Sequence, residues 1–168
     1  DYYPGTVYET MLSGHESMGS VSSGGRYDSL ASDGKHTYPG VGISLGLTRL
    51  LAPMIGKGSI AASRSVPSAV LVAVNTEDDR EVSQHIARQL RSRGVPCEVA
   101  PKADKFGKQI RYADRRSIPF VWFPGSVHDG VRGDDEVKDI RSGEQVVARA
   151  DSWNPPAADL WPTVVGTW

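Results

Sequence analysis

An unbroken apolar run at residues 69–74 constrains the fold of this 168-residue chain more than any other feature. Strands that are buried on both faces have such continuous runs, whereas strands with one solvent-exposed face alternate between apolar and polar residues. The next segment places Val82, Ile86 and Leu90 at helical spacing and ends at Gly94. A covered strand followed by an amphipathic helix is typical of α/β domains with a largely parallel sheet.

This alternation continues to about residue 150. Residues 95–100 and 118–123 are predicted as further strands, and the helix between them carries Phe106, Ile110 and Ala113 on one face. Residues 136–140 and 145–148 are predicted as a hairpin around Ser142-Gly143. We therefore expect an α/β domain with a mixed sheet of about five strands and flanking helices.

The first 56 residues follow a different pattern. Residues 6–12 and 17–22 are predicted as paired strands, and the glycine-spaced residues 39–51 as a strand that leads into a helix limited by Pro53. A sheet this small is not stable alone in water, so we expect the remnant of a larger antiparallel sheet, whose edges another copy can cover.

Two segments have low sequence complexity or an irregular pattern. Residues 57–66, rich in Gly, Ser and Ala, are the expected linker. Residues 151–168 form a Pro- and Trp-rich tail with no convincing helical period, and we expect Trp153, Trp161 and Trp168 to pack back onto the domain. Thr76 is the expected cap of the helix that follows the first covered strand.

Composition excludes several classes of protein. The single Cys97, interpreted as a small core residue, rules out an internal disulfide and a cysteine-rich zinc site. The four histidines are scattered without metal spacing, so no metal site is expected. No apolar run approaches the roughly 18 residues of a membrane span, and the chain opens without the features of a signal peptide. We expect no membrane partner and a cytoplasmic location.

The net charge of −1 hides a basic stretch between residues 80 and 116, which holds ten bases and four acids. Such a stretch can dock a polyanion such as RNA. A solvated helix surface is the alternative interpretation, and charge alone favours it. The acidic run at residues 134–136 is likewise interpreted as a solvated loop.

Two glycine-bearing patterns are candidate ligand sites. Adjacent tyrosines at residues 2–3, followed by Gly24-Gly25, can present hydroxyls and flat rings to a small polar ligand. The stretch from Gly40 to Arg49 places an arginine on the first turn of a helix, where it can reach phosphate oxygens. For the tyrosines and Gly24-Gly25 an ordinary hairpin is the alternative, and the residues alone favour it. The stretch from Gly40 to Arg49 is weak evidence by itself, and it is not a P-loop because it lacks the lysine followed by Ser or Thr.

Taken together, these segments resemble histidyl-tRNA synthetases, a family of class II aminoacyl-tRNA synthetases. Residues 1–9 (DYYPGTVYE) and 23–30 (SGGRYDSL) are similar to the two histidine-specific motifs, and residues 42–50 (GISLGLTRL) to class II motif 3. Residues 105–114 (KFGKQIRYAD) resemble the signature of the anticodon-binding domain, which other members of the subgroup share. The resemblance implies a catalytic-domain remnant at residues 1–56 and an anticodon-binding domain at residues 67–150.

The resemblance also implies roles for single residues. Tyr2, Tyr3 and Tyr27 match positions that bind histidine, Gly25 and Gly46 match backbone next to the adenylate, and Arg49 matches the arginine that grips the ATP phosphates. The candidates for tRNA contact are the basic residues Lys102, Lys105, Lys108 and Arg111.

The implied activity is the ATP- and magnesium-dependent charging of histidine tRNA through histidyl-adenylate, by an enzyme that is a homodimer. The catalytic arginine that precedes the first motif is missing here, as are class II motifs 1 and 2. We therefore expect the fragment to be inactive alone, to hold no cofactor tightly and to keep its affinity for the anticodon stem-loop. The alternative is a non-catalytic, synthetase-like regulatory or RNA-binding paralogue.

Overall fold

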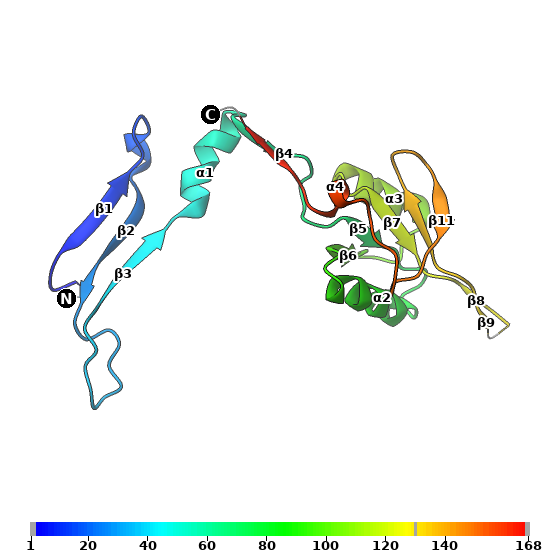
Figure 1. Cartoon of the computed structure of the whole chain (residues 1–168), viewed down its shortest axis with the longest axis horizontal. Coiled ribbons are helices and arrows are strands. Elements are labelled where there is room, and N and C mark those ends of the chain that lie inside the picture. Colours follow the sequence, from blue (N-terminus) through cyan, green and yellow to red (C-terminus); the bar gives the residue numbers. More distant parts are fainter. Residues whose placement is uncertain (1–2, 130, 167–168) are drawn as a thin grey trace. The chain divides into compact units, whose positions relative to one another are not determined.

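The computed structural model describes residues 3–129 and 131–166, which form two compact units, one within residues 3–61 and one within residues 62–165 (Figure 1). A short two-stranded sheet pairs β4 (Ile60–Ala62) with β12 (Val164–Gly166). In the part of the chain that is described, no helix is both long enough and apolar enough to cross a bilayer.

The first unit is a three-stranded antiparallel sheet followed by one helix. Strands β1 (Val7–Met11), β2 (Ser20–Tyr27) and β3 (Gly40–Leu45) pair in that order, and α1 (Leu47–Gly56) contains Pro53. The return strand begins later than the sequence predicts, because a 3₁₀ turn, η1 (Glu16–Met18), occupies its expected start. The Glu16 carboxylate stabilises this turn by accepting the Gly14 N–H at 2.8 Å.

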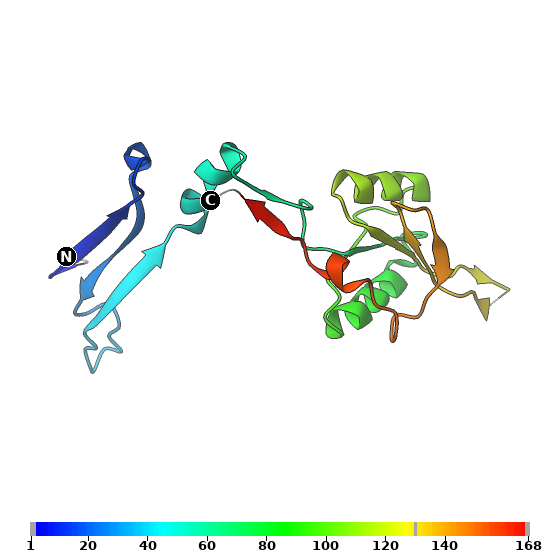
Figure 2. The ribbon, with the colours of Figure 1, turned by 45° about the horizontal axis from the view of Figure 1, so that its top comes forward.

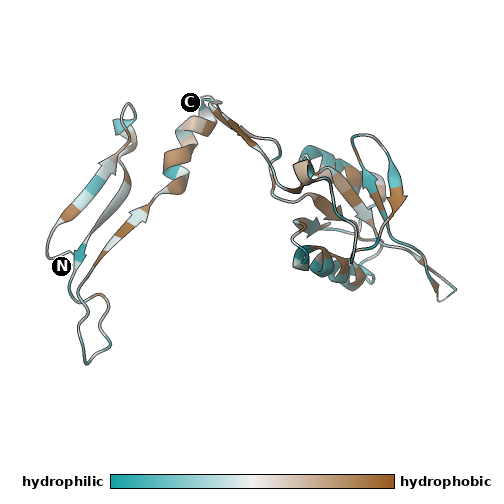
Figure 3. Ribbon diagram, viewed as in Figure 1, coloured by the Kyte–Doolittle hydropathy of each residue, from teal (hydrophilic) through white to brown (hydrophobic). Residues whose placement is uncertain are grey.

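Strand β3 and helix α1 of this unit are rich in hydrophobic residues, which are brown in Figure 3, and several of these side chains are exposed. Val41, Ile43, Leu47 and Ile55 each keep 60–70% of their surface exposed. Monomeric proteins seldom leave so many large apolar side chains uncovered on neighbouring elements. The pattern matches the expected remnant of a larger sheet.

The second unit contains the mixed five-stranded sheet that the sequence predicts. Its order is β11 (Gln145–Val147), β10 (Glu136–Asp139), β7 (Phe120–Phe123), β5 (Val70–Val72) and β6 (Cys97–Val99). Strand β5 runs parallel to both β6 and β7, whereas β10 runs antiparallel to β7 and β11. Chain reversal after β7 therefore gives the sheet its mixed character.

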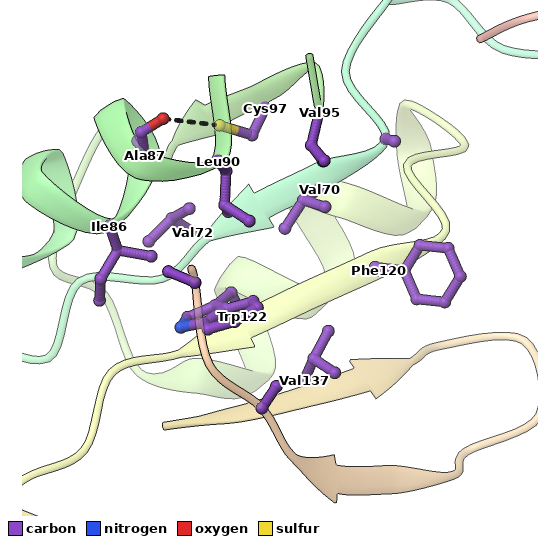
Figure 4. Close-up of a cluster of buried hydrophobic side chains, with 13 residues drawn as sticks. Val70, Val72, Ile86, Ala87, Leu90, Val95, Cys97, Phe120, Trp122 and Val137 are labelled. Carbon is purple, nitrogen blue, oxygen red and sulfur yellow. Dashed lines mark hydrogen bonds between the residues drawn. The ribbon is translucent and has the colours of Figure 1, made fainter. Parts of the chain in front are cut away.

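Helices α2 (Arg80–Ser92) and α3 (Phe106–Arg115) cover opposite faces of this sheet (Figure 2). Alternate residues of the central strands point to opposite faces, so each helix packs on its own core. Ile86 and Leu90 of α2 pack around Trp122, as Figure 4 shows, whereas Ala113 of α3 packs on Leu71. Cys97 is buried in the first of these cores, as predicted.

The start of α2 differs from the prediction that Thr76 caps it. Asp79 is the N-cap residue, and the Thr76 hydroxyl instead accepts the Asp79 N–H at 3.3 Å and donates to its carboxylate at 2.7 Å. The segment before Asp79 is thus a side-chain-supported turn rather than the first turn of the helix.

Residues 151–165 of the tail belong to the second unit, and they contain a short helix, α4 (Ala157–Leu160), that the sequence did not predict. Trp153 packs edge-on against Phe120 and Trp122, with ring centroids 5.4 and 5.7 Å apart, which confirms its predicted packing. The prediction for Trp161 was wrong, since 56% of this side chain is exposed. Trp168 lies outside the described residues.

Two arginines connect the tail to the rest of the domain through hydrogen bonds. Arg93, after the last turn of α2, donates to the carbonyls of Ala150 and Trp153 at 3.0 and 2.8 Å. The buried Arg64 donates to the carbonyls of Asp159 and Leu160 at 2.7 and 2.9 Å. These main-chain contacts carry no sequence periodicity, so the pattern of apolar residues did not reveal them.

The interpretation of the acidic run at residues 134–136 as a solvated loop holds for the exposed Asp134 but was wrong for Asp135 and for Glu136, which begins β10. Only 10% of the Asp135 side chain is exposed, and its carboxylate is paired with Arg132. This contact lies beside a small hairpin of β8 (Val127–His128) and β9 (Val131–Arg132), which extends from the edge of the domain (Figure 1).

Candidate functional sites

Glycines of the first unit make room for tyrosine rings. A β-carbon at Gly25 would lie 2.7 Å from Cδ1 of Tyr3, and one at Gly40 would lie within 2.8 Å of the Tyr27 ring. Such distances are too short for any residue but glycine. Two of the predicted residues, Tyr3 and Gly25, are therefore in direct contact. Tyr2 lies outside the described residues.

A third ring is fixed in the same way. The Tyr8 ring lies over Gly24, and its hydroxyl donates to the Gly42 carbonyl at 2.7 Å. Tyr8 thus bridges β1 and β3 across β2, whose small residues leave space for it. Because 37% of Tyr3 is exposed, that ring can still meet a ligand.

Arg49 and Gly46 lie together at the start of α1. The Gly46 N–H donates to the Val21 carbonyl at 2.9 Å, and Nη1 of Arg49 donates to the Ser20 carbonyl at 2.7 Å. Both residues are thereby anchored to the beginning of β2, while the Arg49 side chain stays exposed. An anchored, exposed guanidinium is suited to a phosphate ligand.

Several basic residues of the second unit lie along α3 and in the loop before it, together with the acids Asp104 and Asp114. Lys102, Lys108 and Arg111 line one open cavity of about 450 Å³, together with Tyr112 and Arg115. Lys105 does not line this cavity. It precedes the helix as its N-cap residue and is exposed. Three of the four predicted contacts therefore share one surface, and sequence reasoning missed Arg115, which the helical spacing from Arg111 places beside them.

Buried polar contacts hold this surface on the sheet. Gln109 is 97% buried, as only 3% of it is exposed. Its amide accepts the Val74 N–H at 3.0 Å and donates to the Val74 carbonyl at 2.8 Å. This pair of bonds fixes α3 to the backbone just after β5, so the basic side chains project from a rigid support.

The two loops beside the cavity are joined by Glu77 and Arg80. Glu77 accepts hydrogen bonds from Arg80 at 2.7 Å and from the Ala103 N–H at 3.0 Å. Arg80 also donates to the Ala100 carbonyl at 3.0 Å. The hydrogen bond from Arg80, with that from Ala103, lowers the pKa of Glu77 to about 2.

A second, smaller cavity of about 270 Å³ was not predicted. It lies where β5 and β7 end, between Asn75 and Thr76 on one side and Pro124 on the other, with Arg132 beside them. The Asn75 amide donates to the Pro124 carbonyl at 3.1 Å, and among the described residues its buried Oδ1 has no partner. One sequence signal was present, because Asn75 directly follows the apolar run, where parallel sheets place ligand sites.

Known proteins of one family match this chain. The family model described as "Anticodon binding domain" matches residues 68–152. The histidine–tRNA ligase of Cutibacterium acnes is 74% identical over 168 residues, which are 100% of this chain and 37% of that protein. The corresponding ligase of Micrococcus luteus is 58% identical over 164 residues, 98% of this chain and 36% of that protein.

A solved structure is also similar. The crystal structure of histidyl-tRNA synthetase from Nostoc sp. PCC 7120 has 37% sequence identity and a TM-score of 0.50, over 89% of this chain and 35% of that one. The chain thus spans little more than a third of the length of the relatives that it matches.

Proposed function

Because the chain belongs to the anticodon binding domain family, in the form found in the C-terminal portion of histidyl-tRNA synthetases, we propose that residues 67–150 bind the anticodon stem-loop of histidine tRNA. The observation that carries this proposal is the cavity along α3, where four bases outnumber two acids and which lies within the residues that match the family. Single-stranded loops offer splayed bases and phosphates, which such a surface can bind.

Within this proposal, Lys102, Lys108 and Arg111 bind phosphates from the cavity, and Lys105 binds one beside it. Their positive charge attracts the RNA backbone at any sequence, so these contacts supply affinity rather than specificity. Gln109 is a positioning residue, because it holds the helix that carries Lys108 and Arg111.

For the first unit we propose part of a histidine and ATP site. Tyr2, Tyr3 and Tyr27 bind histidine, and the backbone at Gly25 and Gly46 lies next to the adenylate. Contact between Tyr3 and Gly25 supports the grouping, because it places a hydroxyl-bearing ring over backbone that no side chain covers. Exposed Arg49 fits the phosphates of ATP, which binds with magnesium.

The whole enzyme would join histidine to the α-phosphate of ATP and pass the histidyl group to the 3′ end of the tRNA. Positioning and charge stabilisation supply most of such catalysis. We further propose that the longer protein is a homodimer and that this part alone does not aminoacylate.

Equilibrium binding tests the proposal. The chain is titrated into an unmodified histidine tRNA transcript and into a transcript with altered anticodon bases, at two salt concentrations, and complexes are resolved by gel shift. Selective binding that weakens with salt is the expected result. Equal binding to both transcripts, or none, would overturn anticodon reading and favour a non-catalytic paralogue with another role.

A further inference from the structure

The segment through which the chain enters the second unit lies beside the end of its tail. We call residues 62–66 the entry segment and residues 161–165 the strap. The Ser63 N–H donates to the Thr163 carbonyl at 2.9 Å, and the Thr163 N–H donates to the Ser63 hydroxyl oxygen at 3.0 Å. Because composition alone predicts a flexible linker at residues 57–66, these contacts with the strap help to order the entry segment.

One buried arginine of the entry segment contacts the tail just before the strap. Only 7% of Arg64 is exposed. Its guanidinium donates to the carbonyls of Asp159 and Leu160 at 2.7 and 2.9 Å. It also donates to the carbonyls of Val66 and Pro67 at 3.2 and 3.0 Å. None of the four acceptors is a carboxylate. Since the guanidinium exchanges water for neutral acceptors, these contacts stabilise the closed arrangement less than ion pairs in the same place would.

The strap buries little apolar surface. Trp161, Val164 and Val165 are all more than half exposed, and no residue of the strap is fully buried. An open cavity of about 480 Å³ is lined by Trp161 and Thr163 on the strap and by Pro119 on the rest of the domain, so the two do not pack closely there. Segments with few buried apolar contacts open at a low cost in free energy.

The part of the tail that precedes the strap is attached differently. Leu160 and Trp153 pack against the core on the α2 side of the sheet. The Asp159 carboxylate accepts two hydrogen bonds from Arg141, at 2.7 and 2.9 Å. These contacts involve neither the strap nor the entry segment, so they persist when the strap separates. The boundary between the fixed and the releasable part of the tail therefore lies between Leu160 and Trp161.

We propose that the strap opens and closes over the entry segment while the rest of the domain stays folded. In the closed state it orders the entry segment, whereas in the open state residues 57–66 are the flexible linker that composition predicts. Opening breaks the two hydrogen bonds between Ser63 and Thr163 and returns the Arg64 guanidinium to water. The chain thus has two states of its linker, and this inference does not depend on RNA binding.

Hydrogen exchange of the whole chain, measured by NMR at urea concentrations below the unfolding transition, tests the proposal. The Ser63 and Thr163 amides report opening of the strap. The Ala73 amide, which is buried and donates to the Trp122 carbonyl at 2.8 Å, reports global unfolding. We expect the Ser63 and Thr163 amides to be protected, yet to exchange at least about 100-fold faster than Ala73 and independently of urea.

Two results would overturn the proposal. If the Ser63 and Thr163 amides had the same dependence on urea as Ala73, the strap would open only when the whole domain unfolds. If they exchanged as fast as amides of an unstructured peptide, the strap would never close.

A pair of matched variants tests the role of Arg64. Arg64→Lys keeps the charge but removes the planar group that reaches several carbonyls at once. Because only the closed state uses these bonds, exchange of the Ser63 and Thr163 amides should become about tenfold faster. Arg93→Lys is the control, since Arg93 binds the part of the tail that stays attached in both states. It should leave the two rates within about twofold.

Equal acceleration in the two variants, or none in Arg64→Lys, would also overturn the proposal. Circular dichroism verifies that both variants are folded. If Arg64→Lys does not fold, the urea dependence of the unaltered chain decides the question by itself.

Discussion

The indole N–H of Trp122 donates to Oδ2 of Asp135 at 3.1 Å, and Trp122 itself is completely buried. The other carboxylate oxygen accepts the Gly125 N–H at 2.9 Å. One acid therefore satisfies a core side chain and the backbone at the base of the β8–β9 hairpin. This contact joins the hydrophobic core to the loop that leads into the β8–β9 hairpin.

Replacing Asp135 with alanine should destabilise the domain by about 2–3 kcal/mol, because it leaves the Trp122 and Gly125 donors without an acceptor. Urea unfolding followed by tryptophan fluorescence measures the change. Asp134→Ala removes an exposed neighbouring acid and serves as the control, with an expected change within about 0.5 kcal/mol. Equal effects of the two substitutions would contradict this role of Asp135.

Gln109→Leu should cost about 2–3 kcal/mol, since Val74 is fully buried and would lose partners for both its N–H and its carbonyl. RNA affinity should fall too, because α3 would lose its fixed position. Gln84→Leu on α2 makes the same chemical change at a half-buried position, and it should change neither the stability nor the RNA affinity. Chemical denaturation and RNA titration of both variants test this, and an RNA affinity unchanged in Gln109→Leu would contradict the positioning role.

Lys108→Ala and Arg111→Ala should weaken RNA binding at every sequence. Because each substitution removes one bond to a phosphate, it should also reduce the slope of log affinity against log salt by about 0.7. Titrations at several salt concentrations measure the slope. Arg88→Ala removes an exposed base from α2, away from the cavity, and should leave the slope unchanged. If all three variants bound RNA equally weakly, the attraction would be diffuse rather than localised at α3.

Glu77 should make stability depend on pH. Its pKa is 4.5 in the unfolded reference and about 2 in the folded chain, so folding favours the charged form. The stabilisation is complete above pH of about 4.5 and disappears as pH falls to about 2. Glu77→Gln should reduce the stability that is lost as the pH falls from about 4.5 to about 2. Thermal unfolding at a series of pH values measures this loss.

Arg80→Met should reduce the same pH-dependent loss of stability, because it removes the main cause of the lowered pKa of Glu77. The double variant should then add little to either single one. Additive effects would mean that the two side chains stabilise the loops independently, which their hydrogen bonds at 2.7 and 2.9 Å argue against.

The architecture of the second unit was predictable because buried strands and buried helix faces have recognisable patterns of apolar residues. The apolar run contains β5, and the helical spacing of Phe106, Ile110 and Ala113 lies within α3. Helix α4 and the tail were not predictable in the same way. They are held by Arg64 and Arg93 through carbonyl oxygens, and every residue type offers a carbonyl.

The candidate sites were predictable only in part. Charge indicated a basic stretch, but not that Lys102 and Lys108 line the cavity while Lys105 does not. Lys102 and Lys105 precede α3, so they do not follow its helical period. Asp135 looked like a surface acid, since its partner Trp122 is 13 residues away and the contact depends on the sheet. Asn75 carried a positional signal, the end of a covered strand, that was not used.

The most direct measurement is to locate the bound RNA on the chain. Amide chemical shifts of the ¹⁵N-labelled chain are followed as an anticodon stem-loop of histidine tRNA is added. Anticodon binding predicts that shifts concentrate in residues 100–115, with residues 3–56 unchanged. Shifts confined to the first unit or to the exposed face of α2, or equal shifts with an altered anticodon, would contradict it.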